Sequence, residues 1–180
     1  MRLHTPHIHA PHTPAAFEKS HIRGHVRPYL VQATLASLAL FAILFIEQGV
    51  SDGIIVVTIA SSTATVFVVP HSIASSPQRV VGGHVVSVVV GLVLWGGLQL
   101  FTGDANTASN FQIDVFGAAA VGLAVLVMAT TNTEHPQAAA TAFGIIVGGF
   151  SFTFIAFILS AAVILSLLRA ALRNRLQNLL

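Results

Sequence analysis

The sequence contains no cysteine among its 180 residues, and only 8% of its residues are charged. The absence of cysteine excludes disulfides, thiol catalysis and thiolate metal sites. Soluble domains carry about 25% charged residues, so an ordinary soluble domain is also excluded. With 54% hydrophobic residues and a mean hydropathy of +0.83, the composition predicts an all-α polytopic membrane protein of about four to five transmembrane helices with broken or re-entrant elements.

Positive charge is concentrated near the two ends of the chain. The net charge is +2, and Arg79 is the only lysine or arginine between Arg27 and Arg169. In a membrane protein this pattern indicates orientation rather than nucleic-acid binding. We therefore expect no nucleic-acid partner and a cytoplasmic N-terminus, in a prokaryotic cell membrane.

Residues 1–28 form a polar, proline-containing stretch that we predict to be a disordered tail. A weak zinc or copper site is the alternative interpretation of its histidines. No apolar run appears before Tyr29, so the first apolar segment is expected to be retained rather than cleaved as a signal peptide. The stretch contains six histidines: His4, His7, His9, His12, His21 and His25.

Residues 29–168 form the predicted transmembrane domain, with apolar segments at residues 29–46, 54–69, 84–101, 113–128 and 138–168. The second segment is short and contains Ser61, Ser62, Thr63 and Thr65, so it either spans or re-enters. Five crossings would place the basic ends on opposite sides. Four spans plus one re-entrant element remove that conflict, and we favour them. Asp114 is the expected start of the fourth helix.

Residues 169–180 form a basic tail, for which we predict an amphipathic helix along the membrane interface. Its arginines are Arg169, Arg173 and Arg175, and its apolar stripe comprises Leu168, Leu172, Leu176 and Leu179.

Two proline–glutamine stretches interrupt the apolar segments. Pro77 and Gln78 precede Arg79, and Pro136 and Gln137 follow a Glu-His pair. Proline is tolerated in the first turn of a helix, where free N–H groups carry partial positive charge. Paired interruptions of this kind indicate a transport site.

Small anions bind hydrogen-bond donors and positive charge. The candidate donors are Arg79, His84 and His135, with the amides of Gln78 and Gln137 and the hydroxyls of Ser61, Ser62, Thr63 and Thr141. Glu134 could pair with Arg79, cap a helix or relay a proton. Buried histidines bonded to carbonyls, and an arginine in a surface loop, are the competing interpretations. The expected helix breaks are Pro77, Pro136, Gly82 and Gly83.

The same residues resemble the HPP family of small integral membrane proteins. Residues 76–84 are similar to that family's Gln-Pro-Arg and Gly-Gly-His signature, and residues 133–142 to its His-Pro-Pro segment. Gln137 stands where the second namesake proline is found. The resemblance covers roughly residues 29–168 and implies about four spans. Plant plastid and cyanobacterial members are associated with nitrite transport.

We therefore expect a transporter or channel for a small anion, with nitrite as the first candidate. Its partners are the lipid bilayer and the anion, and the chain could enclose a pore alone or as a homo-oligomer. No cofactor, metal or enzymatic reaction is expected. The alternatives are a structural or sensory membrane subunit, and a membrane enzyme that uses Glu134 with His135.

Overall fold

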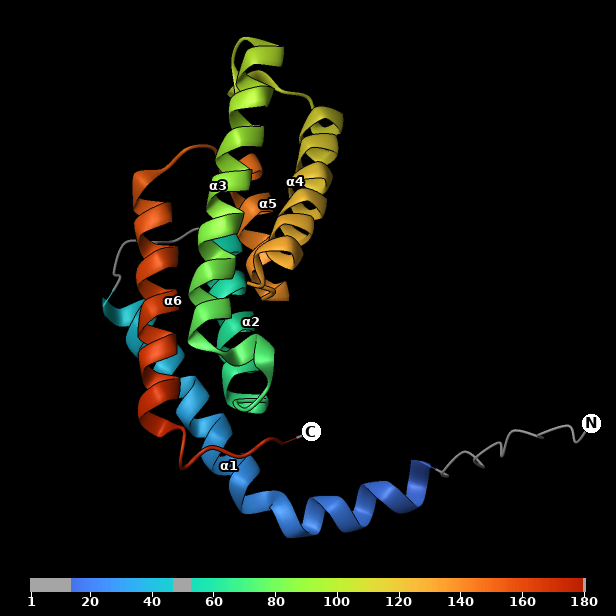
Figure 1. The fold of residues 1–180 in the computed structure, drawn as a ribbon, viewed down its shortest axis with the longest axis vertical. Helices are drawn as coiled ribbons and strands as arrows, with labels where there is room; N and C mark the ends of the chain where they lie inside the picture. The colour runs from blue at the N-terminus through green and yellow to red at the C-terminus, as the bar shows by residue number, and fades with distance from the viewer. Residues whose placement is uncertain (1–13, 47–52, 180) are drawn as a thin grey trace, which may run out of the picture.

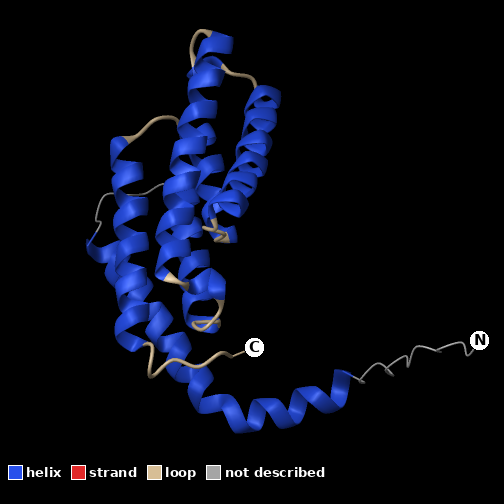
Figure 2. Cartoon of the chain, in the orientation of Figure 1, coloured by secondary structure: helices blue, strands red, loops and turns tan. Residues whose placement is uncertain are grey.

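The computed structural model describes residues 14–46 and 53–179, and regular structure in these ranges is helical (Figure 2). The long helices are α1 (Pro14–Ile46), α3 (Pro77–Thr102), α4 (Asn110–Thr131) and α6 (Phe152–Leu172). Two shorter helices, α2 (Gly53–Val68) and α5 (Ala139–Gly148), lie between them. Three 3-10 turns complete the order: η1 (Ile73–Ser75), η2 (Ala105–Thr107) and η3 (Pro136–Ala138).

Four helices of the described chain are long and apolar enough to cross a membrane, namely Val26–Phe45 within α1, and α3, α4 and α6. The fold is thus the all-α polytopic membrane architecture that the composition predicts. Outward-facing side chains along these helices include Leu38, Phe41, Val93, Leu126 and Val163. Such apolar surface is what a hydrocarbon environment requires.

Successive helices run in opposite directions, with α3 in the middle of the bundle (Figure 1). One core lies among α1, α2, α3 and α6, with Ile145 from α5, and a second lies among α3, α4 and α5. Trp95 on α3 packs against both cores. Because the six α-helices of the described residues alternate in direction, the N-terminal half of α1 and the end of α6 lie at the same end of the bundle.

The two short helices are largely enclosed by their neighbours. At 1.5 Å per residue, the 16 residues of α2 extend about 24 Å and the 10 residues of α5 about 15 Å, less than a hydrocarbon core of about 30 Å. Ser62 and Phe67 on α2, and Thr141 and Ile145 on α5, are buried. The prediction of four spans plus one short element was therefore incomplete, since there are two short helices.

The second short helix was missed because the sequence predicts a single segment over residues 138–168. The structure divides it at residues 149–151, and Gly149 has a φ of +75°, a conformation that few residues other than glycine adopt. Ser151 then starts α6, because its hydroxyl accepts a hydrogen bond from the N–H of Phe154.

Local signals explain the ends of α3 and α4. Pro77 is the first residue of α3 and Ser76 its N-cap, so the helix begins before the predicted segment 84–101. Gly82 and Gly83, which were predicted to break a helix, therefore lie inside α3. Gly103 ends the helix in the left-handed conformation. The start of α4 was predicted wrongly at Asp114. Ser109 caps it instead, in a reciprocal capping box with Gln112.

The N-terminal boundary also differs from the prediction. Residues 1–13, with His4, His7, His9 and His12, lie outside the described residues, but α1 begins at Pro14 rather than at residue 29. Pro28 lies inside this helix, and Figure 1 shows that the first part of α1 turns away from the bundle. A proline inside a helix removes a backbone hydrogen bond and favours such a bend.

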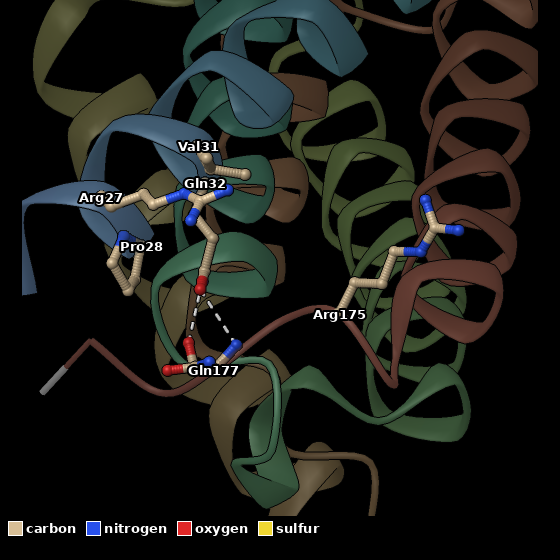
Figure 3. Close-up of a pocket in the computed structure, with 6 residues that line it drawn as sticks. All are labelled: Arg27, Pro28, Val31, Gln32, Arg175 and Gln177. Atoms are coloured by element: carbon tan, nitrogen blue, oxygen red, sulfur yellow. Dashed lines mark hydrogen bonds between the residues drawn. The ribbon is translucent and has the colours of Figure 1, made fainter.

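The C-terminal residues are held against the middle of α1 and the end of α2. Helix α6 ends at Leu172, so the amphipathic helix predicted beyond this point is not formed. Gln32 bonds both backbone groups of Gln177 (Figure 3) and also donates to the carbonyl of Phe67. The N–H of Leu179 donates to Val68 O at 2.9 Å. Extended backbone is favoured over the predicted helix here because it satisfies carbonyls that the end of α2 leaves free.

Candidate functional site

The two predicted helix breaks lie against each other. A Cβ atom added to Gly82 would lie 2.7 Å from Cγ2 of Thr133, and one added to Gly83 would lie 2.8 Å from Cβ of His135. Both distances are shorter than ordinary contacts, so only glycine allows the start of α3 to approach residues 133–138 this closely. The predicted pairing of the two breaks is thereby observed in the structure.

A series of buried, hydrogen-bonded polar groups crosses the place where the start of α3 meets residues 133–138, which we call the junction. His84 on α3 lies 2.9 Å through Nδ1 from Oγ1 of Thr141 on α5, and 3.2 Å through Nε2 from Oγ of Ser62 on α2. The same Ser62 Oγ lies 3.1 Å from Nε2 of His135. Nδ1 of His135 lies 2.9 Å from the carbonyl oxygen of Ala74 in η1. We call Thr141, His84, Ser62, His135 and Ala74 the histidine chain.

The four polar side chains of the histidine chain are closed to solvent. His84, His135, Ser62 and Thr141 each have 0% relative exposure. The two imidazole centroids are 5.5 Å apart. Each ring nitrogen has a hydrogen-bond partner, so the two histidines are satisfied without an ion.

One arrangement of protons satisfies every bond with two neutral rings. The Ala74 carbonyl has no proton, so Nδ1–H of His135 donates to it, and Nε2 must accept from the Ser62 hydroxyl. Ser62 has one proton, so its oxygen accepts from Nε2–H of His84. His84 Nδ1 then accepts from the Thr141 hydroxyl. The two histidines are therefore opposite tautomers.

Burial of His135 lowers its pKa below the ordinary value of 6.5, because charging the ring inside the protein costs solvation. The hydrogen bond to Ala74 O opposes this shift, because that carbonyl accepts from the charged ring as well. Desolvation is the larger effect, which favours the neutral ring.

Arg79 lies at the edge of the junction and is engaged by residues of the other break. Its guanidinium forms an ion pair with Glu134 through Nη1 and donates through Nη2 to Oδ1 of Asn132. Its side chain is 17% exposed and that of Glu134 is 42% exposed. Of the three roles considered for Glu134, pairing with Arg79 is the one observed.

The remaining predicted residues fall into two groups. Pro136 occupies the first position of η3, as Pro77 does in α3, and both prolines and Gln78 are exposed. Gln137 is partly buried, and its Oε1 is a buried acceptor with no hydrogen-bond partner among the described residues. Ser87, one turn along α3 from His84, has a buried hydroxyl that is equally without a partner. These two oxygens are free to bind water or a polar solute.

The four hydroxyls predicted as candidate donors to the anion lie in different places in the structure. Ser62 and Thr141 join the histidine chain, whereas Thr63 donates back to Ile59 O at 2.8 Å and Ser61 is exposed. Sequence analysis missed Asn132, because an asparagine that ends a helix in the left-handed conformation has an obvious local role. It also missed the carbonyl of Ala74, which no side-chain pattern could reveal.

The described residues contain no group of three or more histidine, cysteine, aspartate or glutamate side chains placed to hold a metal. A separate surface cleft of about 340 Å³ lies between α1 and the C-terminal residues. Figure 3 shows its six lining side chains: Arg27, Pro28, Val31, Gln32, Arg175 and Gln177.

Comparison with known protein families gives a match to the transmembrane region of HPP proteins over residues 20–179. The chain belongs to the HPP family. It is also 33% identical over 127 residues to a transmembrane protein of Dictyostelium discoideum. The matched region is 67% of this HPP chain and 41% of that relative, so the chain spans well under half the relative's length. No solved structure matches significantly. Membership confirms the family that the two motifs resemble, and it identifies a multi-pass integral membrane protein in contact with the lipid bilayer.

Proposed function

We propose that this HPP protein is a transporter or channel for a small anion, with nitrite as the first candidate. The observation that supports it is the meeting of both helix breaks with two short, enclosed helices at one buried polar junction. Polar groups inside a membrane domain are costly and usually serve a solute path. Broken helices at such a junction are typical of transporters.

The chemistry of the junction suits a small polar anion better than a cation. It brings together a guanidinium, imidazole rings and hydroxyls, with Glu134 as the acidic side chain at its edge. Gln137 and Ser87 add buried oxygens without partners. Nitrite is chosen by the resemblance to family members associated with nitrite transport.

We also propose that the end of the bundle bearing the arginines faces the cytoplasm. Arg27, Arg79, Arg169 and Arg175 lie toward the end where α1 enters the bundle and α6 finishes, while Asp104 lies in the α3–α4 connection at the other end (Figure 1). Positively charged residues are retained on the cytoplasmic side. Both described ends of the chain would then be cytoplasmic.

Nitrite uptake by proteoliposomes tests the proposed function. Vesicles without protein supply the background, because nitrous acid crosses bare lipid. We expect Arg79→Gln to lower uptake at least threefold, and Arg173→Gln, an equal charge change on an exposed arginine, to leave it unchanged. Wild-type uptake equal to that of empty vesicles would refute the proposal.

Glu134→Gln provides a second test in the opposite direction. Removing the carboxylate leaves Arg79 with an uncompensated positive charge, so the variant should take up nitrite faster than wild type at neutral pH. Slower uptake would indicate that Glu134 holds Arg79 in a productive position. Absence of flux together with co-purification of a stable partner would favour the structural or sensory subunit instead.

A further inference from the structure

The histidine chain has a feature that the proposed function does not use. It is an unbroken series of proton donors and acceptors from Thr141 on α5 to Ala74 in η1, formed by separate elements. Every link is 3.2 Å or shorter. The side chains are fully buried, so bulk water does not compete for them.

We propose that the histidine chain conducts one proton from Thr141 to His135, and that protonated His135 supplies the positive charge for the co-transported anion. The inference rests on the proposed function, which it deepens by naming the coupling ion. It predicts symport of one proton with one monovalent anion, an electroneutral process.

The transfer balances atom by atom. A proton delivered to Thr141 binds Oγ1, and the original hydroxyl proton of Thr141 passes to Nδ1 of His84. Nε2–H of His84 passes its proton to Ser62 Oγ, and the original Ser62 proton passes to Nε2 of His135. Thr141, His84 and Ser62 are neutral again, and His135 carries two protons and a charge of +1. Reverse transfer, or transfer of the proton to the co-transported anion, unloads His135.

Positive charge is missing from the junction while His135 is neutral. Arg79 from α3 is compensated by Glu134, and His84 from α3 is neutral in the arrangement derived above. The described side chains of α2, η1 and α5 include no titratable or charged group, and Asp114 on α4 lies at the far end of that helix from the junction. Loading His135 therefore changes the net charge of the junction from zero to +1, which attracts an anion.

The proton positions can be tested independently of transport. In ¹⁵N-histidine-labelled protein in lipid, NMR should show His84 protonated at Nε2 and His135 protonated at Nδ1. Loss of individual signals in His84→Gln and His135→Gln assigns them. Two identical tautomers, or a permanently charged ring at pH 7.5, would overturn the proposal.

Proton movement is tested with a pH-sensitive dye inside proteoliposomes. A proton gradient with the outside more acidic should drive nitrite accumulation together with proton entry. A membrane potential should have little effect. Ser62→Ala and the isosteric Thr141→Val should each reduce coupled proton entry at least tenfold. The matched controls are Ser166→Ala and Thr63→Val, whose buried hydroxyls bond only to their own helices at Ala162 O and Ile59 O.

The outcomes separate the two proposals. Nitrite flux that is undiminished and still proton-coupled in Ser62→Ala and Thr141→Val refutes the histidine chain and leaves the anion transporter standing. Absence of nitrite flux from the wild-type protein refutes the proposed function. The NMR measurement of the two histidine tautomers then tests the proposed histidine chain independently. Thermal unfolding of each variant shows whether a loss of coupling follows loss of the fold.

Discussion

Gly83 and His135 lie so close that a Cβ atom on the glycine would come within 2.8 Å of Cβ of the histidine and within 3.0 Å of the carbonyl oxygen of Thr133. This contact holds α3 against the residues between α4 and α5. It also brings His135 near His84, one residue after Gly83. Close packing at a glycine thus places the two imidazoles where a single serine hydroxyl joins them.

Gly83→Ala is expected to destabilise the protein. The added methyl group has no flexible neighbour to displace, since backbone and Cβ atoms surround it. Overpacking of this kind costs about 1–3 kcal/mol. Thermal unfolding in detergent measures the loss. Gly96→Ala on the same helix is the matched control, because no atom lies within 4 Å of its added Cβ. Helix propensity favours alanine there by about 0.5–1 kcal/mol, so equal destabilisation by both variants would contradict the packing argument.

The sequence was sufficient to predict the two helix breaks, because the signals are local. Pro77 and Pro136 occupy first helical positions. The glycines that allow the close approach, Gly82 and Gly83, are visible in the sequence, although they lie inside α3 rather than breaking it. The break at Gly149 was not predictable in the same way. Glycine is common inside transmembrane helices, and only the backbone geometry shows that this one has a positive φ.

Tertiary partners explain the other differences. The leucine stripe beyond Leu172 is a valid helical pattern, but Leu176 is buried in an extended segment whose backbone bonds to Gln32 and His71. Likewise, the sequence identifies Arg79 as the isolated mid-chain cation without specifying its partners. Glu134 was one option, and Asn132 was not considered.

Gln32→Met should reveal how much the C-terminal segment contributes to stability. Gln32 is 2% exposed, and its amide bonds to Phe67 O and to both backbone groups of Gln177. Leaving the buried carbonyl of Phe67 without a donor costs about 1–3 kcal/mol. The two part-buried bonds to Gln177 are lost as well, so we expect a total loss of about 2 kcal/mol. Gln78→Met, at an exposed glutamine, is the control. Comparable unfolding temperatures for the two variants would show that the segment is only loosely attached.

The buried His135 predicts a decline in stability at acidic pH. Its pKa is lower in the folded protein than the ordinary 6.5 of the unfolded chain, so the unfolded state binds the extra proton first. The stabilisation is complete above pH 6.5 and is lost as pH falls from there toward the folded pKa. One proton gives a slope of at most about 1.4 kcal/mol per pH unit. His84, Arg79 and Glu134 are the other titratable groups of the junction, so the comparison is with His135→Gln. Denaturant unfolding between pH 7.5 and 5 should give a shallower slope for that variant, and identical slopes would show that folding does not lower the pKa of His135.

The absence of cysteine allows the proposed orientation to be tested by labelling single introduced cysteines. Asn106 in η2 and Arg173 after α6 are both exposed and lie at opposite ends of the bundle. With the arginine-rich end in the cytoplasm, a membrane-impermeant maleimide added to intact bacterial cells should modify Asn106→Cys and not Arg173→Cys. Permeabilised cells should show labelling of both variants, and the wild-type chain gives no background because it has no thiol. The reverse pattern would mean that charge does not set the orientation of this protein. Labelling of both positions in intact cells would contradict the alternating arrangement of six helices, because these two positions would then share one side of the membrane.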